Sequence, residues 1–221
     1  MGQVIPHQTG EEMRSPRRPS PSTVDGVSFL DAPVLENEFV RLEPLSSAHH
    51  DDLVAAVKGG ELWRTWYTRV PSPEGMAEAI ADRLALHTSG RMVPWAVIDP
   101  ATGRAVGMTT YLNIEPENQR LEIGSTWLGR DAQGTRINPA AKLLLLGRAF
   151  DDLGCIAVEF RTHWHNRQSR AAIEKLGAKQ DGVLRNRTVF ANGTVRDTVV
   201  YSIIDGEWPT VRFALTERLR G

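Results

Sequence analysis

The sequence predicts one α+β domain, with a sheet of mixed strand direction and helices on both of its faces. At 221 residues the chain is long enough for one substantial domain and short for two. Segments of alternating apolar residues, typical of strands, are interleaved with segments of helical periodicity. An Asn192-Gly193 pair near the C-terminus predicts a two-residue turn between two strands. A mixture of elements in this order favours a sheet covered by helices on both sides.

The periodicity of apolar residues also places each element along the chain. Strands are expected over residues 36–42, 92–98, 105–112, 121–127, 156–160, 185–190 and 195–204. Helices are expected over residues 47–57, 73–86, 139–153, 166–176 and 208–219. The third helix has the strongest boundary signals, because Asn138 suits its N-cap, Pro139 its first position and Gly154 its C-terminal stop.

The first 26 residues differ in composition from the rest of the chain. They contain Pro6, Pro16, Pro19 and Pro21, three arginines and few apolar residues. Such a stretch buries too little surface to offset its ordering entropy, so a flexible tail is expected over 1–26 and a single domain over 27–221.

Composition narrows the class of protein. A formal net charge of -1, from 26 basic and 27 acidic residues, gives no electrostatic reason to expect nucleic acid or an anionic membrane as partner. No apolar run reaches transmembrane length and no signal-peptide core is present, so a cytoplasmic location is expected. The lone Cys155 is expected to be a small buried hydrophobic residue. A homodimer is expected only because dimers are the commonest soluble assembly.

A polar loop leads into the third helix over residues 133–138. Backbone N–H groups of such a loop and of the first helical turn point at one spot, where the helix dipole is positive. A pyrophosphate suits that spot, and Arg136 and Lys142 would add positive charge. A loop in which Gly134 merely turns the chain explains the spacing equally well.

Three blocks, Leu121–Leu128, Gln133–Asn138 and Asn166–Ala178, together resemble the GNAT acetyltransferase superfamily. Within it, the similarity is to the RimJ/RimL-type ribosomal-protein N-terminal acetyltransferases, and it covers most of the chain after about Leu35. The family loop follows a Gln/Arg-x-x-Gly-x-Gly/Ala pattern. Arg136 stands where a glycine is usual, and it would either crowd the pyrophosphate or bind it through its side chain.

The resemblance implies a mostly antiparallel sheet that is splayed between its fourth and fifth strands, with acetyl-CoA as co-substrate and no metal. It implies that Asn166 bonds the pantetheine arm and that Ser169 lies near the thioester sulfur, although each residue would also serve as a helix cap or packing residue. The cofactor-binding residues implied are Thr126, Trp127, Leu128, Gln133, Gly134, Thr135, Arg136, Ile137, Asn138, Lys142, Asn166 and Arg170.

Acetyl transfer to an amine requires a proton acceptor, because the amine must attack in its neutral form. Glu122 is the favoured base, since it precedes the splay and alternation puts it opposite the face of Leu121, Ile123 and Trp127. A solvated strand glutamate is an equal alternative. Asp197 is the second candidate, unless it pairs with an arginine of the final hairpin.

Two other groups complete the expected chemistry. A backbone N–H near Trp127 would stabilise the oxyanion, and Ser169 would give a proton to the leaving thiolate. Trp63 and Trp66 are expected to shape the acceptor pocket. His163 and His165 lack a third ligand and make a poor metal site.

The function expected is therefore an acetyl-CoA-dependent N-acetyltransferase acting on a protein N-terminus or a small amine. The alternative is a non-catalytic CoA-binding sensor or scaffold, which Arg136 and the unsettled base would favour.

Overall fold

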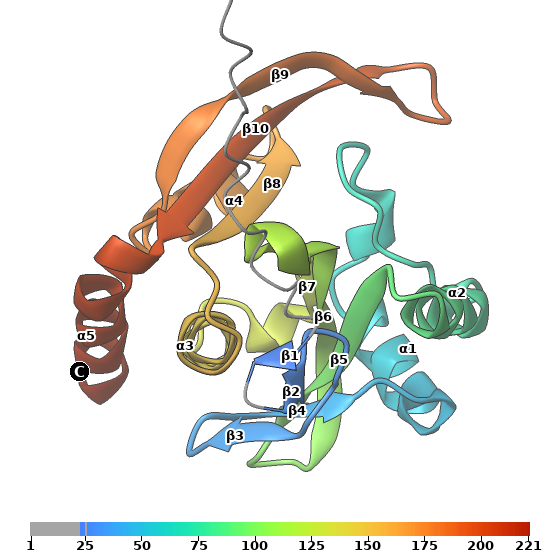
Figure 1. The fold of residues 1–221 in the computed structure, drawn as a ribbon. Coiled ribbons are helices and arrows are strands. Elements are labelled where there is room, and N and C mark those ends of the chain that lie inside the picture. Colours follow the sequence, from blue (N-terminus) through green and yellow to red (C-terminus); the bar gives the residue numbers. More distant parts are fainter. Residues whose placement is uncertain (1–22, 25) are drawn as a thin grey trace, which may run out of the picture.

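The computed structural model describes residues 23–24 and 26–221 and shows a central sheet with helices packed on it (Figure 1). The strands are β1 Thr23–Val24, β2 Val27–Ser28, β3 Leu35–Asn37, β4 Val40–Pro44, β5 Met92–Asp99, β6 Arg104–Glu115, β7 Arg120–Leu128, β8 Ala157–His163, β9 Lys179–Val189 and β10 Val195–Ile204. The helices are α1 His50–Lys58, α2 Met76–Thr88, α3 Ile137–Gly147, α4 Arg167–Glu174 and α5 Trp208–Arg220.

The main sheet has eight strands in the order β3-β4-β5-β6-β7-β8-β10-β9. Every neighbouring pair is antiparallel except β7 and β8, which run parallel. The predicted α+β class and mostly antiparallel sheet are confirmed.

The parallel pair is short. Residues 120–122 of β7 pair with residues 157–159 of β8, while β7 continues to Leu128 and β8 to His163. The two strands therefore separate after Glu122 and Glu159, and this opening is the predicted splay between the fourth and fifth long strands.

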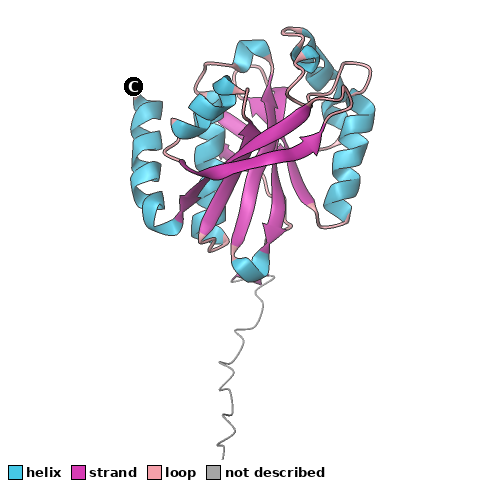
Figure 2. Cartoon of the chain, turned by 90° about the horizontal axis from the view of Figure 1, so that it is seen from above, coloured by secondary structure: helices cyan, strands magenta, loops and turns pink. Residues whose placement is uncertain are grey.

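Helices cover both faces of the sheet, as Figures 1 and 2 show. On one face α3 and α5 pack over a large apolar cluster that includes Leu121 and Ile123. On the other face α1 and α2 pack over a smaller cluster that includes Met108 and Trp127. The sheet thus separates two apolar clusters, and β7 contributes side chains to both.

A bulge in β7 determines which of its side chains face each of the two apolar clusters. Gly124 pairs with Thr110 and Trp127 with Met108, so β7 carries one more residue than β6 over this stretch. Ser125 has a φ of 46°, which marks the irregularity. The expectation that Trp127 shares a face with Leu121 and Ile123 is wrong, because the extra residue reverses the alternation beyond it.

Several element boundaries differ from the expected ones, among them the start of β9, which is Lys179 instead of residue 185. The strand expected over 36–42 is two strands, because the Asn37 side chain accepts hydrogen bonds from the backbone N–H of Phe39 and Val40 and closes a tight turn. The helix expected from 139 begins earlier, with Arg136 as N-cap. It passes into a π-helical turn over 148–152 before Gly154, whose φ of 62° ends it.

The tail expected over 1–26 falls mostly outside the described residues. Within its range, β1 pairs with β2, so the segment just before residue 27 takes part in a short hairpin. Cys155 is buried as expected, and burial raises the pKa of its thiol to about 12. No described helix is long and apolar enough to cross a lipid bilayer.

Candidate active site

Glu122 lies at the point where β7 and β8 part. Its side chain is 6% exposed, so the alternative of a solvated strand glutamate is wrong. One carboxylate oxygen, Oε2, accepts a 2.6 Å hydrogen bond from Asn113 Nδ2 and lies 3.5 Å from Arg161 Nε. The other, Oε1, lies 2.8 Å from the position that a Cβ at residue 124 would occupy. Gly124 therefore makes room for the carboxylate.

Burial raises the pKa of Glu122, although the charges of Arg161 and Arg196 and the hydrogen bond from Asn113 lower it. A raised pKa makes a carboxylate a better proton acceptor. Glu122 is thus suited to the role of general base on electrostatic as well as positional grounds.

A second carboxylate, Glu159, holds the neighbouring arginines in place. Its Oε2 accepts a 2.7 Å hydrogen bond from Arg161 Nη2, and its Oε1 accepts one from Arg120. Arg161 therefore bridges Glu159 and Glu122 across the last paired position of the two strands. This arrangement fixes the Arg161 guanidinium beside the proposed base.

The edge of β7 beyond Glu122 faces β8 without pairing to it. Residues 126–128 lie on this stretch, and each strand residue directs its backbone N–H and C=O toward one neighbouring strand. Alternate backbone groups therefore point into the opening, where an extended ligand can bond them as an added strand would. These are the groups that Thr126, Trp127 and Leu128 were expected to offer the pantetheine arm.

The loop before α3 presents amide donors to one side. In the described part of the chain, the backbone N–H groups of Gly134, Thr135, Arg136 and Asn138 have no acceptor, and that of Ile137 bonds Thr135 Oγ1 at 3.2 Å. Free amides at the start of an 11-residue helix suit a phosphate group. The residues present thus fit a pyrophosphate, as acetyl-CoA binding requires.

The backbone of Arg136 is unstrained. Its φ of -70° and ψ of -14° are ordinary helical values, which any residue adopts. Its guanidinium carbon lies 5.3 Å from the centre of the Phe39 ring. Gln133 Nε2 donates a 2.8 Å hydrogen bond to the carbonyl of Leu128 and so ties the loop to the end of β7.

Lys142 is not placed at the pyrophosphate loop as expected. Its Nζ is buried between α3 and the sheet, where it donates to Thr126 Oγ1 at 3.0 Å and to Thr109 Oγ1 at 3.3 Å. Burial lowers the pKa of Lys142 to about 7, because no carboxylate accompanies it. Lys142 therefore supports the irregular part of β7 instead of offering a fixed charge to a phosphate.

The start of α4 lies close to the loop before α3, because Gln168 Nε2 donates a 3.4 Å hydrogen bond to Gln133 Oε1. Asn166 is the N-cap: its Oδ1 accepts a 3.0 Å hydrogen bond from the backbone N–H of Ser169. The Asn166 Nδ2 and the Ser169 hydroxyl have no partner in the described chain, so both stay available to a ligand. Arg170 is already engaged, because its Nε donates to Tyr201 at 3.0 Å and its guanidinium stacks on Trp164.

An aromatic cluster lies at the end of β8. Trp66, half exposed in the segment between α1 and α2, contacts His163 at a ring-centre distance of 5.3 Å and His165 at 5.7 Å. Figure 1 shows this turquoise segment rising beside β8 and the β9–β10 hairpin. Trp63 instead packs with the α1–α2 cluster. No group of three or more potential metal ligands occurs among the described residues.

Asp197 is engaged within the β9–β10 hairpin. Its carboxylate accepts a 2.6 Å hydrogen bond from Arg185 Nε and a 2.8 Å bond from the backbone N–H of Asn186, and these interactions lower its pKa. The sequence left open whether Asp197 pairs with a cross-strand arginine, and the structure has this pair. Asp197 is therefore a structural residue of the hairpin.

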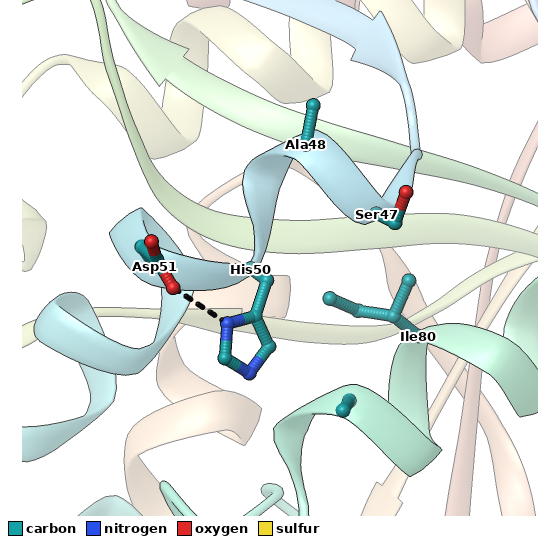
Figure 3. A pocket seen from close by; sticks show the side chains of 6 residues that line it. Ser47, Ala48, His50, Asp51 and Ile80 are labelled. Carbon is teal, nitrogen blue, oxygen red and sulfur yellow. Dashed lines mark hydrogen bonds and ion pairs between the residues drawn. The ribbon is translucent and has the colours of Figure 1, made fainter.

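A separate surface pocket lies between the turn before α1 and helix α2 (Figure 3). Ser47, His50, Asp51 and Ile80 line it, with His50 Nδ1 2.7 Å from Asp51 Oδ1. None of the expected cofactor-binding or catalytic residues lines this pocket.

An open parallel pair beside a loop of free amides can hold an extended ligand that carries a phosphate group. The family model of the acetyltransferase (GNAT) domain matches residues 40–179, and the chain belongs to this family. Membership implies acetyl-CoA as co-substrate.

The similar proteins agree with this family assignment. The chain is 32% identical to the "Putative ribosomal N-acetyltransferase YdaF" of Bacillus subtilis over 106 residues, or 48% of this chain and 57% of YdaF, so the match spans little more than half of that protein. It is 25% identical to the "Uncharacterized N-acetyltransferase YoaA" of the same organism, over 78% of this chain and 97% of YoaA. A crystal structure of a GCN5-related N-acetyltransferase from Brucella melitensis superposes with a TM-score of 0.78 at 30% identity, covering 92% of this chain and 88% of the other.

Sequence reasoning missed the residues that surround Glu122. Asn113, Glu159 and Arg161 were not singled out, although Glu159, Arg161 and His163 alternate opposite Val158 and Phe160 along one strand. That alternation was a usable signal that charged side chains share the face of Glu122. Asn113 gave none, since its position depends on an irregular pairing of β6 with β7.

Proposed function

We propose that this protein is an acetyl-CoA-dependent N-acetyltransferase that transfers the acetyl group directly to a primary amine, either a protein N-terminus or a small amine. The observation that carries the proposal is the position of Glu122, a buried carboxylate of raised pKa at the point where β7 and β8 separate.

The chain's own groups suit each requirement of the reaction. Glu122, directly or through a water, takes the proton that an incoming ammonium must lose. Backbone N–H groups of the unpaired stretch of β7 stabilise the charge that develops on the carbonyl oxygen. The Ser169 hydroxyl, which has no partner in the described chain, supplies a proton to the departing thiolate. Holding the amine and the thioester together contributes much of the rate.

Cofactor binding is divided between two places. The free amides over residues 134–138 take the pyrophosphate, and Gln133 holds this loop against the end of β7. The Asn166 Nδ2 and the open edge of β7 take the pantetheine arm. The side chains of Lys142 and Arg170 are engaged elsewhere, so we assign them supporting roles.

Two facts favour an amino group as the acceptor. The relatives YdaF and YoaA are both named N-acetyltransferases. In addition, a buried carboxylate beside the opening attracts a cationic amine and then removes its proton, whereas an alcohol gains nothing from the first step. A ribosomal-protein N-terminus is one acceptor consistent with the name of YdaF.

The test is to incubate the protein with acetyl-CoA and a panel of amines, following thiol release and identifying the acetylated product by mass spectrometry. Thiol release that depends on the amine and matches the acetylated amine in amount supports the proposal. Tight binding of acetyl-CoA without any turnover would instead favour the non-catalytic sensor.

A further inference from the structure

Several buried hydrogen-bond donors of the described chain lack an acceptor. Among the described residues, five buried side-chain nitrogens lack a partner, and four of them belong to Arg83, Trp127, His163 and Arg196. Arg83 reaches the β7 bulge, where its Nη2 lies 3.5 Å from the carbonyl of Ser125. An unpaired buried donor costs about 1–3 kcal/mol, so a cluster of them favours an external group rich in acceptors.

His163 acts as a donor in this cluster. Its Nδ1 accepts a 3.0 Å hydrogen bond from the backbone N–H of His165, so in the neutral ring the proton is on Nε2. Burial, helped by the charge of Arg196, lowers the pKa of His163 and keeps the ring neutral. With a side chain only 2% exposed, its unpaired Nε2 is a buried donor without an acceptor.

The acidic groups nearby are already committed. Glu159 binds Arg120 and Arg161, and Glu122 lies 3.5 Å from the same Arg161. Asp197 is paired with Arg185. These interactions use up the carboxylates that would otherwise neutralise further cations.

Arg69 and Arg196 remain without an ion pair or a hydrogen bond in the described chain. The Arg69 guanidinium carbon lies 5.3 Å from the ring centre of Phe190, and that ring stacks on His163 at 5.8 Å. The charge of Arg196 interacts with those of both Glu122 and Arg69. Two unpaired cations therefore lie close enough for their charges to interact, and the charge of one of them, Arg196, also interacts with the buried carboxylate of Glu122.

From this arrangement we propose that the amine acceptor also carries a carboxylate, which Arg69 and Arg196 bind while its amino group meets Glu122. The inference rests on the proposed function and names its substrate class: amino acids, or peptides with an acidic residue near the N-terminus. A polycationic amine is disfavoured, because its second charge would meet Arg69 and Arg196.

Matched acceptors test the inference on the unaltered protein. Alanyl-aspartate amide and alanyl-asparagine amide are peptide acceptors that differ by one carboxylate. Free alanine and alaninamide are a second pair that also differs by one carboxylate, and this pair tests amino acids as acceptors. We expect the carboxylate member of at least one pair to have a kcat/KM about 10- to 100-fold higher, as a charge-assisted pair provides.

Variants then assign the preference to the two arginines. In Arg69→Gln and Arg196→Gln the preference, which is the ratio of the two kcat/KM values within a pair, should fall to about unity, while the acetyl-CoA dissociation constant stays near the wild-type value. Arg187→Gln is the matched control, since Arg187 is an exposed arginine of the same hairpin, and it should keep the preference. Arg69 is exposed, so its variant is informative even where Arg196→Gln folds poorly.

The outcomes separate the two proposals. Equal kcat/KM within both pairs would overturn the carboxylate inference and leave the N-acetyltransferase standing. A preference that survives Arg69→Gln with unchanged size would also overturn it. Acetyl-CoA binding with no turnover of any amine would overturn the proposed function and the inference together.

Discussion

Glu122 and Glu159 face each other as the last paired residues of β7 and β8, and within the described chain the two strands share no further pair. Each carboxylate is buried, and Arg161 interacts with both. The end of the strand pairing therefore coincides with the charged cluster from which the proposed base is drawn.

Glu122→Gln removes the proton acceptor but keeps the size and the hydrogen bond from Asn113. We expect kcat to fall about 10²- to 10⁴-fold at neutral pH, the range of general base catalysis, while acetyl-CoA affinity stays nearly unchanged. Steady-state kinetics and calorimetric titration measure the two quantities. Glu115→Gln, an exposed glutamate at the end of β6, is the control. Full activity in Glu122→Gln would remove Glu122 as the base.

The pH dependence of the wild-type enzyme should carry the same signature. Glu122 acts as a base only when ionised, and its pKa is raised above the ordinary value of 4.5. Activity should therefore decline with falling pH already above the range in which an exposed glutamate titrates, and this acidic limb should be absent from the residual activity of Glu122→Gln. A limb of equal position in both proteins would assign it to another group.

Gly124→Ala tests the space that the Glu122 carboxylate occupies. An added Cβ would lie 2.8 Å from Glu122 Oε1, so the carboxylate must move. We expect kcat to drop at least about tenfold, with little change in acetyl-CoA affinity, because a small displacement of a catalytic group is costly. Gly182→Ala is the control, since the same addition there meets no atom within 4 Å. Equal kinetics in the two variants would contradict the role of Gly124.

Asn166 offers a way to separate capping from ligand binding. Asn166→Ala loses both, and acetyl-CoA binding should weaken by about 1–3 kcal/mol. Asn166→Asp keeps an oxygen that accepts from the Ser169 N–H but lacks the amide donor. It should therefore retain thermal stability while binding acetyl-CoA as weakly as Asn166→Ala. Wild-type affinity in Asn166→Asp would show that the residue is only a cap.

Lys142 predicts a specific dependence of stability on pH. Its pKa is about 7 when folded, against a model-peptide value of 10.5, so between these values the unfolded chain binds more protons than the folded one. Stability must then rise with pH, by about 2–3 kcal/mol between pH 7 and 9 from this group alone. In Lys142→Met, denaturant unfolding should lack this rise. Identical pH profiles for the two proteins would contradict the burial of an unpaired lysine.

Local patterns predicted most of the fold. Alternation located the long strands, and Asn192-Gly193 located the last hairpin, because both signals act over a few residues. The turn at Asn37 was not predicted, because the two strands that it joins have only three and five residues. The predicted face of Trp127 was wrong because the bulge at Ser125 depends on pairing with β6, and no local pattern encodes this pairing.

Some residues of the candidate site could likewise be predicted from local patterns, and others could not. Asn166 and the loop over 133–138 could be found because a helix N-terminus has a local signature. The surroundings of Glu122 could not, since Arg69, Arg161 and Arg196 come from separate segments that meet only when the sheet forms. Lys142 was misplaced because its distance along the chain from the loop says nothing about the direction of its side chain, which packs inward onto Thr126 and Thr109.

A crystal structure of the protein with CoA tests the central claim most directly. We predict that the diphosphate lies against the backbone N–H groups of residues 134–138, and that the pantetheine arm runs along β7 beyond Glu122, with its sulfur near Ser169. CoA bound at another place, or β7 and β8 paired along their whole length in the complex, would contradict the account.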